Sequence, residues 1–363
     1  MYKGIGISKD QLSNDGESCI LYGELYTKYK SETIREVISK TNIDNTKLVR
    51  SKANDVIIPC SGETAEDIAT ARCVLNDNIL LGGDLNIICL HGYDGAFMSY
   101  QLNGRRKYDI AKVAQGVSVV HLYGEHLKGV KTVNPCLEEQ HKISKLLSLL
   151  DERISTQNKI IEDLKKLKSA IIEIEYTPNT KITSHIGDVI EQISKRNKNN
   201  AIQNVLSISN RQGFIKQSDQ FENRNIASED TSNYKIVEQN DFAFNPARIN
   251  VGSIARLTTF EKGIVSPMYV CFRTQENVAP EYIDYFFESK HFYCEIQKRL
   301  EGSVRQCLSF EGLCNIPFSL PSFEMQQLIG KRLFTLGQKI RMETDLLELL
   351  NKQKQYLLRQ MFI

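Results

Sequence analysis

Few side chains in this sequence have the types and spacing that catalysis would need. The stretch FNPARI, residues 244–249, lacks the second proline and the aromatic ring of an Asn-Pro-Pro-aromatic loop, because Ala247 and Arg248 stand in their places. His121 and His126 are five positions apart around a Tyr-Gly turn, which does not favour a metal site. No Gly-x-Gly-x-x-Gly follows a strand-like run. We therefore expect neither a catalytic centre nor a bound metal or cofactor.

The side chains best suited to chemistry are instead those that recognise bases. Arginine pairs with guanine, asparagine and glutamine pair with adenine, and hydroxyls and cations fix the register on phosphates. The second half of the chain places such residues in loops: Asn210, Arg211, Gln212, Asn245, Arg248, Asn250, Ser303, Arg305 and Gln306. Arg248 and Arg305 are the strongest candidates, because each lies in a mostly apolar stretch, where a charged side chain without a function is not expected. The alternative is that these are ordinary solvated loop residues.

The first half of the chain holds different residues at the corresponding places. They are Tyr26, Thr27, Lys28, Ser61, Thr64, Ser118 and His121. Arg105 and Lys107 form a local basic cluster with Arg106, and we expect them to contact phosphate if they contact DNA.

Two long amphipathic segments must position these loops. From Leu137 to Ile172 apolar residues recur at three- and four-residue steps, which predicts one helix of roughly 50 Å at about 1.5 Å per residue. A second segment of the same design follows Pro321. An apolar stripe of this length must face another helix, so we expect the two segments to pair as a coiled coil. The pattern allows either orientation, and we expect the antiparallel one.

A constant shift of 186 positions relates the two segments and the globular parts before them. It takes Pro135 to Pro321 and Gln140 to Gln326 without a gap. It also takes the following residues of the first globular part onto the second: Asn54 and Asp55 onto Asn240 and Asp241, Gly116 onto Gly302, Leu122 onto Leu308, and Leu127 onto Leu313. The chain is therefore an internal duplication of a globule followed by a helix.

This ordered double array resembles the specificity subunit (HsdS) of type I restriction-modification enzymes. The resemblance covers nearly the whole chain. The matching residues of the first copy are Gly116, Ser118, Leu122, Pro135, Glu138, Glu139, Gln140, Ile143, Leu150, Asp151, Ile154, Ile161, Leu164 and Lys168. The second copy departs at Met325 and Gly337, which stand where the first copy has Glu139 and Asp151.

The resemblance implies a non-catalytic subunit that recognises a bipartite target in double-stranded DNA. Two methyltransferase subunits would bind the helices, one per repeat, and bring S-adenosylmethionine. Restriction subunits, with ATP and Mg²⁺, would join through them. Leu149, Ile160, Phe334, Leu346 and Leu349 widen the apolar face of the helices beyond one seam, which is consistent with further protein packing there, or with packing on the chain's own globules.

The composition restricts the class of protein without identifying it. A net charge of +2 over 363 residues is nearly neutral and does not by itself indicate a nucleic-acid binder. The nine cysteines include no Cys-x-x-Cys pair, which argues against a disulfide framework or a structural zinc site and fits a reducing cytoplasm. No run of about 18 apolar residues indicates a membrane span.

From these patterns we predict an α+β fold of two pseudo-symmetric mixed α/β target recognition domains separated by two long helices. The predicted parts are residues 1–134, 135–176, 177–320 and 321–363, in the order domain, helix, domain, helix. Residues 182–200, which precede the second domain's core, are expected to have no counterpart before Gly4. The main alternative is a duplicated coiled-coil scaffold that binds protein and not DNA. The target sequence, its spacer, the methylated base, and whether this copy is active or a silent recombining cassette do not follow from the sequence.

Overall fold

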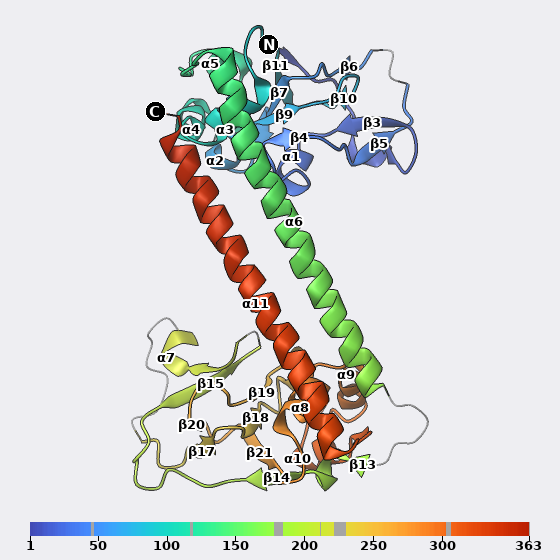
Figure 1. The fold of residues 1–363 in the computed structure, drawn as a ribbon, viewed down its shortest axis with the longest axis vertical. Helices are drawn as coiled ribbons and strands as arrows, with labels where there is room; N and C mark the ends of the chain where they lie inside the picture. Colours follow the sequence, from blue (N-terminus) through green and yellow to red (C-terminus); the bar gives the residue numbers. More distant parts are fainter. Residues whose placement is uncertain are drawn as a thin grey trace. The chain divides into compact units, whose positions relative to one another are not determined.

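The computed structural model describes residues 1–44, 47–116, 119–177, 184–210, 212–220, 230–302 and 306–362. They form two compact units, Met1–Ile160 together with Glu343–Ile363, and Ile161–Met342 (Figure 1). Each unit contains twisted sheets, short helices and one half of each long helix.

The sheets of the first unit are built from short strands. One has the order β1-β11-β7-β9-β4, with bounds Tyr2–Lys3, Leu85–Ile88, Asp55–Pro59, Arg72–Val74 and Thr33–Ile34. Another has the order β2-β5-β3-β10-β6, with bounds Leu12–Ser13, Ser39–Thr41, Glu17–Ile20, Leu80–Leu81 and Val49–Arg50. A two-stranded ribbon joins β12 (Val120–His121) to β8 (Ser61–Gly62). The helical elements are η1 (Lys9–Gln11), α1 (Glu24–Thr27), α2 (Ala65–Ile68), α3 (Gly95–Asn103), α4 (Lys107–Val113) and α5 (Gly124–Leu127).

The second unit repeats this plan with fewer strands. One sheet has the order β14-β21-β18-β19, with bounds Ile190–Ile193, Val270–Thr274, Phe242–Phe244 and Ile254–Arg256. The other has the order β16-β15-β20-β17, with bounds Gly213–Lys216, Val205–Ser209, Lys262–Val265 and Lys235–Glu238. A ribbon joins β13 (Ser184–His185) to β22 (Pro317–Phe318). The helical elements are η2 (Ile186–Asp188), α7 (Gln217–Gln220), η3 (Ile249–Val251), α8 (Pro280–Phe286), α9 (Lys290–Gln297) and α10 (Phe310–Cys314).

Both expected long helices are present. They are α6, Leu137–Tyr176, and α11, Phe323–Gln360. A glutamine fixes the start of each helix in the same way. Gln140 Nε2 donates to the Pro135 carbonyl at 2.8 Å, and Gln326 Nε2 donates to the Pro321 carbonyl at 3.0 Å.

Within each unit the two helices run in opposite directions. In the first unit Lys354 Nζ lies 2.6 Å from Asp151 Oδ1, and Gln157 Nε2 donates to the Glu343 carbonyl at 2.9 Å. The partner on α11 therefore moves toward lower numbers as α6 moves toward higher ones. In the second unit, Ile172 and Tyr176 of α6 share a core with Leu333 and Ile329 of α11.

The duplication is visible as repeated backbone bonds. The Leu122 amide donates to the Cys60 carbonyl at 2.8 Å, and 186 positions later the Leu308 amide donates to the Pro246 carbonyl at 3.0 Å. The backbone also repeats its left-handed positions, at Asn54 (φ 81°) and Asn240 (φ 71°) and at Gly116 (φ 125°) and Gly302 (φ 102°). The same shift therefore superposes the folded frames as well as the sequences.

One expectation about the chain's first residues needs correction. Strand β1 pairs antiparallel with β11, as β14 pairs antiparallel with β21, and each lies at the edge of the equivalent sheet. Of the two strands within residues 182–200, β14 therefore has a counterpart before Gly4, in Tyr2–Lys3. Sequence comparison missed it because the paired residues share no side-chain type.

Candidate nucleic-acid interface

Three separate segments of the first unit meet at one edge. Tyr26, in helix α1 between β3 and β4, donates a hydrogen bond from its hydroxyl to the Ser61 carbonyl at 3.0 Å. Ser61 in β8 lies directly opposite His121 in β12. The structure thus brings together Tyr26, Ser61 and His121, which the sequence placed far apart. Burial raises the pKa of Tyr26, so its hydroxyl stays protonated and remains a donor.

An exposed aromatic ring at this edge was missed by the sequence reasoning. Tyr123 is 46% exposed, its ring stacks on His121 at a centroid distance of 6.3 Å, and Lys3 Nζ lies 5.8 Å from the ring centroid. The signal was available, because Tyr123 lies two residues after His121 in a turn. A tyrosine hydroxyl and a lysine side by side can both contact phosphate or base edges.

Three other predicted residues of the first unit have local structural partners. Thr64 accepts a hydrogen bond from the Asp67 amide at 3.0 Å and caps α2. Lys28 lies 2.7 Å from Glu24 and 2.6 Å from Ser39, and the Thr27 hydroxyl donates to the Gly23 carbonyl at 3.0 Å. These bonds give each residue a role in folding that does not require DNA.

Predicted residues of the second unit also converge on one edge. Asn210 and Gln212 lie at the tip of the β15–β16 hairpin, where Ser209 is paired with Gly213. A side-chain carbon built on Gly213 would lie 3.6 Å from Ala255 in β19, so the tip is beside the loop that joins β18 to β19. That loop carries Asn245, Arg248 and Asn250.

The third segment of this edge is joined to the same loop. The Leu308 amide bonds to the Pro246 carbonyl at 3.0 Å, which places the exposed Gln306 next to the loop. Arg248 is exposed, and its guanidinium has no hydrogen-bond or ion-pair partner in the described part of the chain. Asn245 is 9% exposed and accepts from the Ala247 amide at 3.1 Å, so it shapes the loop. Arg248 is therefore the cation most available for a partner at this edge.

Four predicted residues lie outside the described residues: Ser118, Arg211, Ser303 and Arg305. The predictions for these positions stay predictions. Arg105 and Lys107 flank the start of α4 in the first unit, away from the β8–β12 ribbon but in contact with the same crevice as the end of α11.

A basic groove in the second unit was also missed. Lys195, Arg196, Lys198 and Lys262 line it, and no carboxylate does among the described residues. Lys262 is paired with Glu238 at 2.8 Å and Arg196 donates to Asn233 at 2.8 Å. The side chains of Lys195 and Lys198 form no ion pair or hydrogen bond within the described ranges, although Lys195 lies close enough to Glu238 to lower its pKa. The sequence signal was the run KRNKNN at 195–200, which a near-neutral total charge concealed.

The arrangement can bind and recognise. Each unit presents hydroxyl, amide, imidazole or guanidinium groups from three segments at one edge, the donors and acceptors that base edges and phosphates require. No group of three or more His, Cys, Asp or Glu side chains suited to a metal occurs among the residues described by the structure. None of the helices within those residues is long and apolar enough to span a membrane.

Comparison with known proteins agrees with the duplicated plan. Residues 176–352 match the family model for the type I restriction modification DNA specificity domain. The type I restriction enzyme MjaVIII specificity subunit of Methanocaldococcus jannaschii is 24% identical over 365 residues, which cover 92% of this chain and 83% of that relative.

A solved structure shows the same fold. The S subunit of a type I restriction-modification system from M. genitalium has a TM-score of 0.63 at 16% identity, covering 100% of this chain and 93% of that chain. The HsdS subunit from Thermoanaerobacter tengcongensis has a TM-score of 0.46 at 14% identity, covering 90% and 85%. With its duplicated frame, its paired long helices and a domain model that matches residues 176–352, the chain is similar to the specificity subunits of type I restriction-modification enzymes.

Proposed function

We propose that this chain is the DNA sequence-specificity subunit of a type I restriction-modification complex and recognises a bipartite target in double-stranded DNA. The first unit would read one half-site through the edge that holds Tyr26, Ser61 and His121. The second unit would read the other through Asn210, Gln212 and Arg248.

One observation carries this proposal. Backbone bonds and left-handed positions of the two units repeat at a shift of 186 positions, but the side chains on the matching loops differ. Ser61, opposite His121, corresponds to Ala247, and His121 corresponds to Cys307. A repeated scaffold with unlike loops is expected if the scaffold is structural and each loop set reads its own sequence.

The partners follow from the exposed parts of the long helices. Leu149 is 54% exposed, Ile160 39%, Leu349 61% and Phe334 49%, whereas Leu346 is half-buried. Apolar side chains exposed to this extent on helices that already bury a seam favour further protein contacts. We infer that two methyltransferase subunits bind here, one per repeat, and that restriction subunits join through them.

The chemistry would then belong to the partners. We propose that this subunit is non-catalytic and binds no cofactor itself, that S-adenosylmethionine is held by the methyltransferase subunits, and that ATP and Mg²⁺ are held by the restriction subunit. The cytoplasm is the compartment in which such a complex meets DNA.

Methylome sequencing tests the proposal. Cells that carry this chain with its methyltransferase should contain a methylated motif of two short parts with a fixed spacer, and the motif should vanish when this gene alone is removed. A methylation pattern that is unchanged by the removal would contradict the proposal.

The rival is a scaffold that binds protein only. It predicts no binding of duplex DNA by the complex of this chain with its methyltransferase, whereas the specificity subunit predicts binding that weakens steeply with salt.

A further inference from the structure

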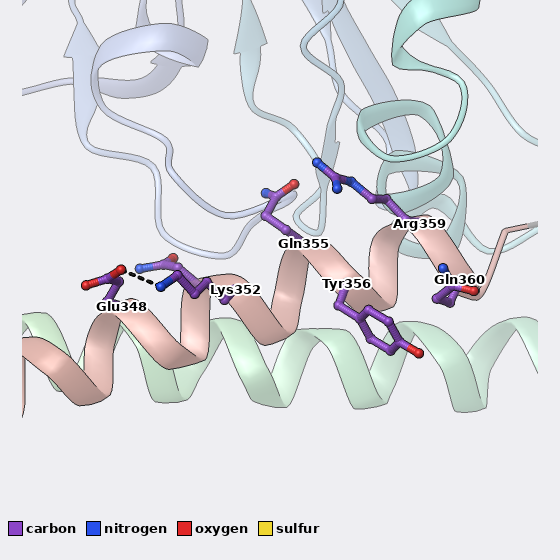
Figure 2. Close-up of a pocket in the computed structure, with 7 residues that line it drawn as sticks. Glu348, Lys352, Gln355, Tyr356, Arg359 and Gln360 are labelled. Carbon is purple, nitrogen blue, oxygen red and sulfur yellow. Dashed lines mark ion pairs between the residues drawn. The ribbon is translucent and has the colours of Figure 1, made fainter.

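A crevice of about 390 Å³ lies in the first unit between the α3–α4 connection and the C-terminal end of α11. Three cations line it, Arg105, Lys107 and Arg359, together with one carboxylate, Glu66. No ion pair or hydrogen bond of the three cationic side chains is present within the ranges that the structure describes. Figure 2 shows Arg359 and Gln355 projecting from α11 toward the globular part of this unit, whereas Tyr356 points away from it.

The walls of the crevice are fixed. Gly104 is packed closely between α11 and α3. A side-chain carbon there would be 2.8 Å from the Leu358 carbonyl oxygen of α11 and 3.0 Å from the Tyr100 carbonyl oxygen of α3. Leu358 is itself buried in a cluster with Phe97 and Tyr100. Because Arg359 directly follows Leu358, the backbone from which its side chain extends is held against α3.

In the second unit the residues that correspond to Arg359 and Arg105 have partners within the chain itself. The shift of 186 positions takes Glu173 to Arg359 and His291 to Arg105. Glu173 Oε1 accepts a hydrogen bond from the Lys290 amide at 2.9 Å, and His291 Nε2 lies 2.8 Å from the Pro317 carbonyl oxygen. In that copy the chain's own carboxylate and carbonyl occupy the equivalent place. In the first copy both positions are arginines, and the carboxylate has no equivalent.

We propose that this crevice binds a phosphodiester group of duplex DNA beside the first half-site; this assignment rests on the proposed function. Three cations against one carboxylate favour an anion, and the guanidinium fork matches two phosphate oxygens. Only the short helix α2, about 6 Å long at 1.5 Å per residue, separates the crevice from the base-reading edge, since α2 contacts both α4 and β8. A backbone phosphate flanking the half-site lies within that reach.

The test uses the complex of this chain with its cognate methyltransferase subunits and a duplex that contains the target. Arg359→Gln is compared with Lys352→Gln, which removes the same charge from the same helix but from a side chain paired with Glu348 at 2.6 Å (Figure 2). Arg359→Glu is the second variant, because the chain's own second copy folds with a carboxylate at this position. Dissociation constants are measured from 50 to 200 mM salt.

Arg359→Gln should weaken binding to target and non-target duplexes alike and lower the salt slope by about 0.9. The loss of affinity across this salt range then becomes about 3.5-fold smaller than in the wild type. Arg359→Glu should weaken binding further, and Lys352→Gln should leave the slope unchanged.

Two results would overturn the assignment while leaving the proposed function intact. One is a wild-type complex that binds its target while Arg359→Gln behaves like Lys352→Gln. The other is thermal stabilisation by inorganic phosphate that Arg359→Gln abolishes without any change in DNA binding, which would make the crevice a site for free anions. A wild-type complex that binds no duplex DNA would overturn the proposed function and the assignment together.

Discussion

Replacing Lys354 with methionine should destabilise the first unit more than any other single charge removal on α11. Lys354 Nζ lies 2.5 Å from Glu32 Oε2 and 2.6 Å from Asp151 Oδ1. All three residues are almost fully buried, with exposures of 8% for Lys354, 6% for Glu32 and 8% for Asp151. The ammonium group therefore joins α11, α6 and the loop before β4 inside the core.

The magnitude follows from what the substitution leaves behind. Methionine keeps most of the buried stem but removes the ammonium group that contacts both buried carboxylates, which leaves Arg72 as the remaining buried cation near them. Asp151 keeps hydrogen bonds from the Tyr100 and Ser31 hydroxyls, both at 2.8 Å, so the loss of the ammonium group destabilises the charged form of Glu32 more than that of Asp151. Breaking one partner out of a buried ion pair costs about 3–5 kcal/mol. For a unit of this size that lowers Tm by roughly 6–20 °C.

The loss of stability in Lys354→Met should depend on pH, because it acts through the protonation of Glu32. Burial raises the pKa of Glu32 above its ordinary value, and Lys354 opposes that rise. Without Lys354 the pKa of Glu32 rises further. A carboxyl group whose folded pKa exceeds its unfolded pKa favours the folded state below the unfolded pKa, and this contribution is lost as pH increases through the folded pKa. The deficit of the variant should therefore be largest near neutral pH and shrink as pH falls toward the unfolded pKa of Glu32, about 4.5.

Urea unfolding followed by circular dichroism between pH 4.5 and 8 measures this. Lys352→Met is the matched control, because its pair with Glu348 is exposed to solvent and contributes little to stability. Lys168→Met tests the equivalent lysine of the second unit, whose partner Glu288 is 47% exposed, and should cost less than Lys354→Met. A Lys354→Met deficit that equals that of Lys352→Met, or that does not change with pH, would refute the reasoning.

Three further predictions concern recognition. Arg248→Gln should weaken binding of the preferred target by roughly 5- to 150-fold, because an arginine–guanine pair contributes about 1–3 kcal/mol. In a randomised duplex library the variant should also lose its base preference at one position of one half-site, and an unchanged preference at every position would exclude this role. Lys195→Gln with Lys198→Gln should weaken binding to all duplexes equally and reduce the salt slope by about 1 to 2; a sequence-dependent loss would assign these lysines to base reading instead. A double deletion would remove one heptad from α6 and one from α11, about 10 Å of helix each. It should change the spacer length of the methylated motif and preserve both half-sites, and an unchanged spacer would show that helix length does not set the spacer.

The long helices and the repeat were accessible from sequence because both depend on local periodicity. Apolar residues at three- and four-residue steps have one low-energy solution, a helix with a buried stripe, whatever the rest of the chain does. Asn54 and Asn240 were matched as sequence, and their shared left-handed backbone explains why asparagine stands at both positions.

Other features were not accessible because they depend on contacts between distant residues. Glu32 and Lys354 are 322 positions apart, and nothing near either residue marks it as buried. Thr64 has the residue type of a phosphate contact, but its hydroxyl is used to cap α2. The convergence of Tyr26 with Ser61 depends on how two different sheets pack, because Tyr26 follows β3 of one sheet and Ser61 follows β7 of the other. Side-chain type alone does not distinguish a residue that stabilises a loop from a residue that the loop makes available to a ligand.

The distribution of side chains on the two edges argues that the half-sites differ in base content. The second unit presents asparagine, glutamine and an arginine, Arg248, that has no ion pair among the residues the structure describes. These are the groups that make bidentate bonds to adenine and guanine in the major groove. The first unit presents Tyr26, Ser61, His121 and Tyr123, which form single hydrogen bonds or ring contacts and discriminate less per base. Three further cations of this unit, Arg105, Lys107 and Arg359, line the crevice, and Lys3 lies beside Tyr123. On this basis the first half-site is held more by its backbone and the second more by its base edges, so substitutions at the second edge should change which sequence is methylated, and substitutions at the first should change how tightly it is held.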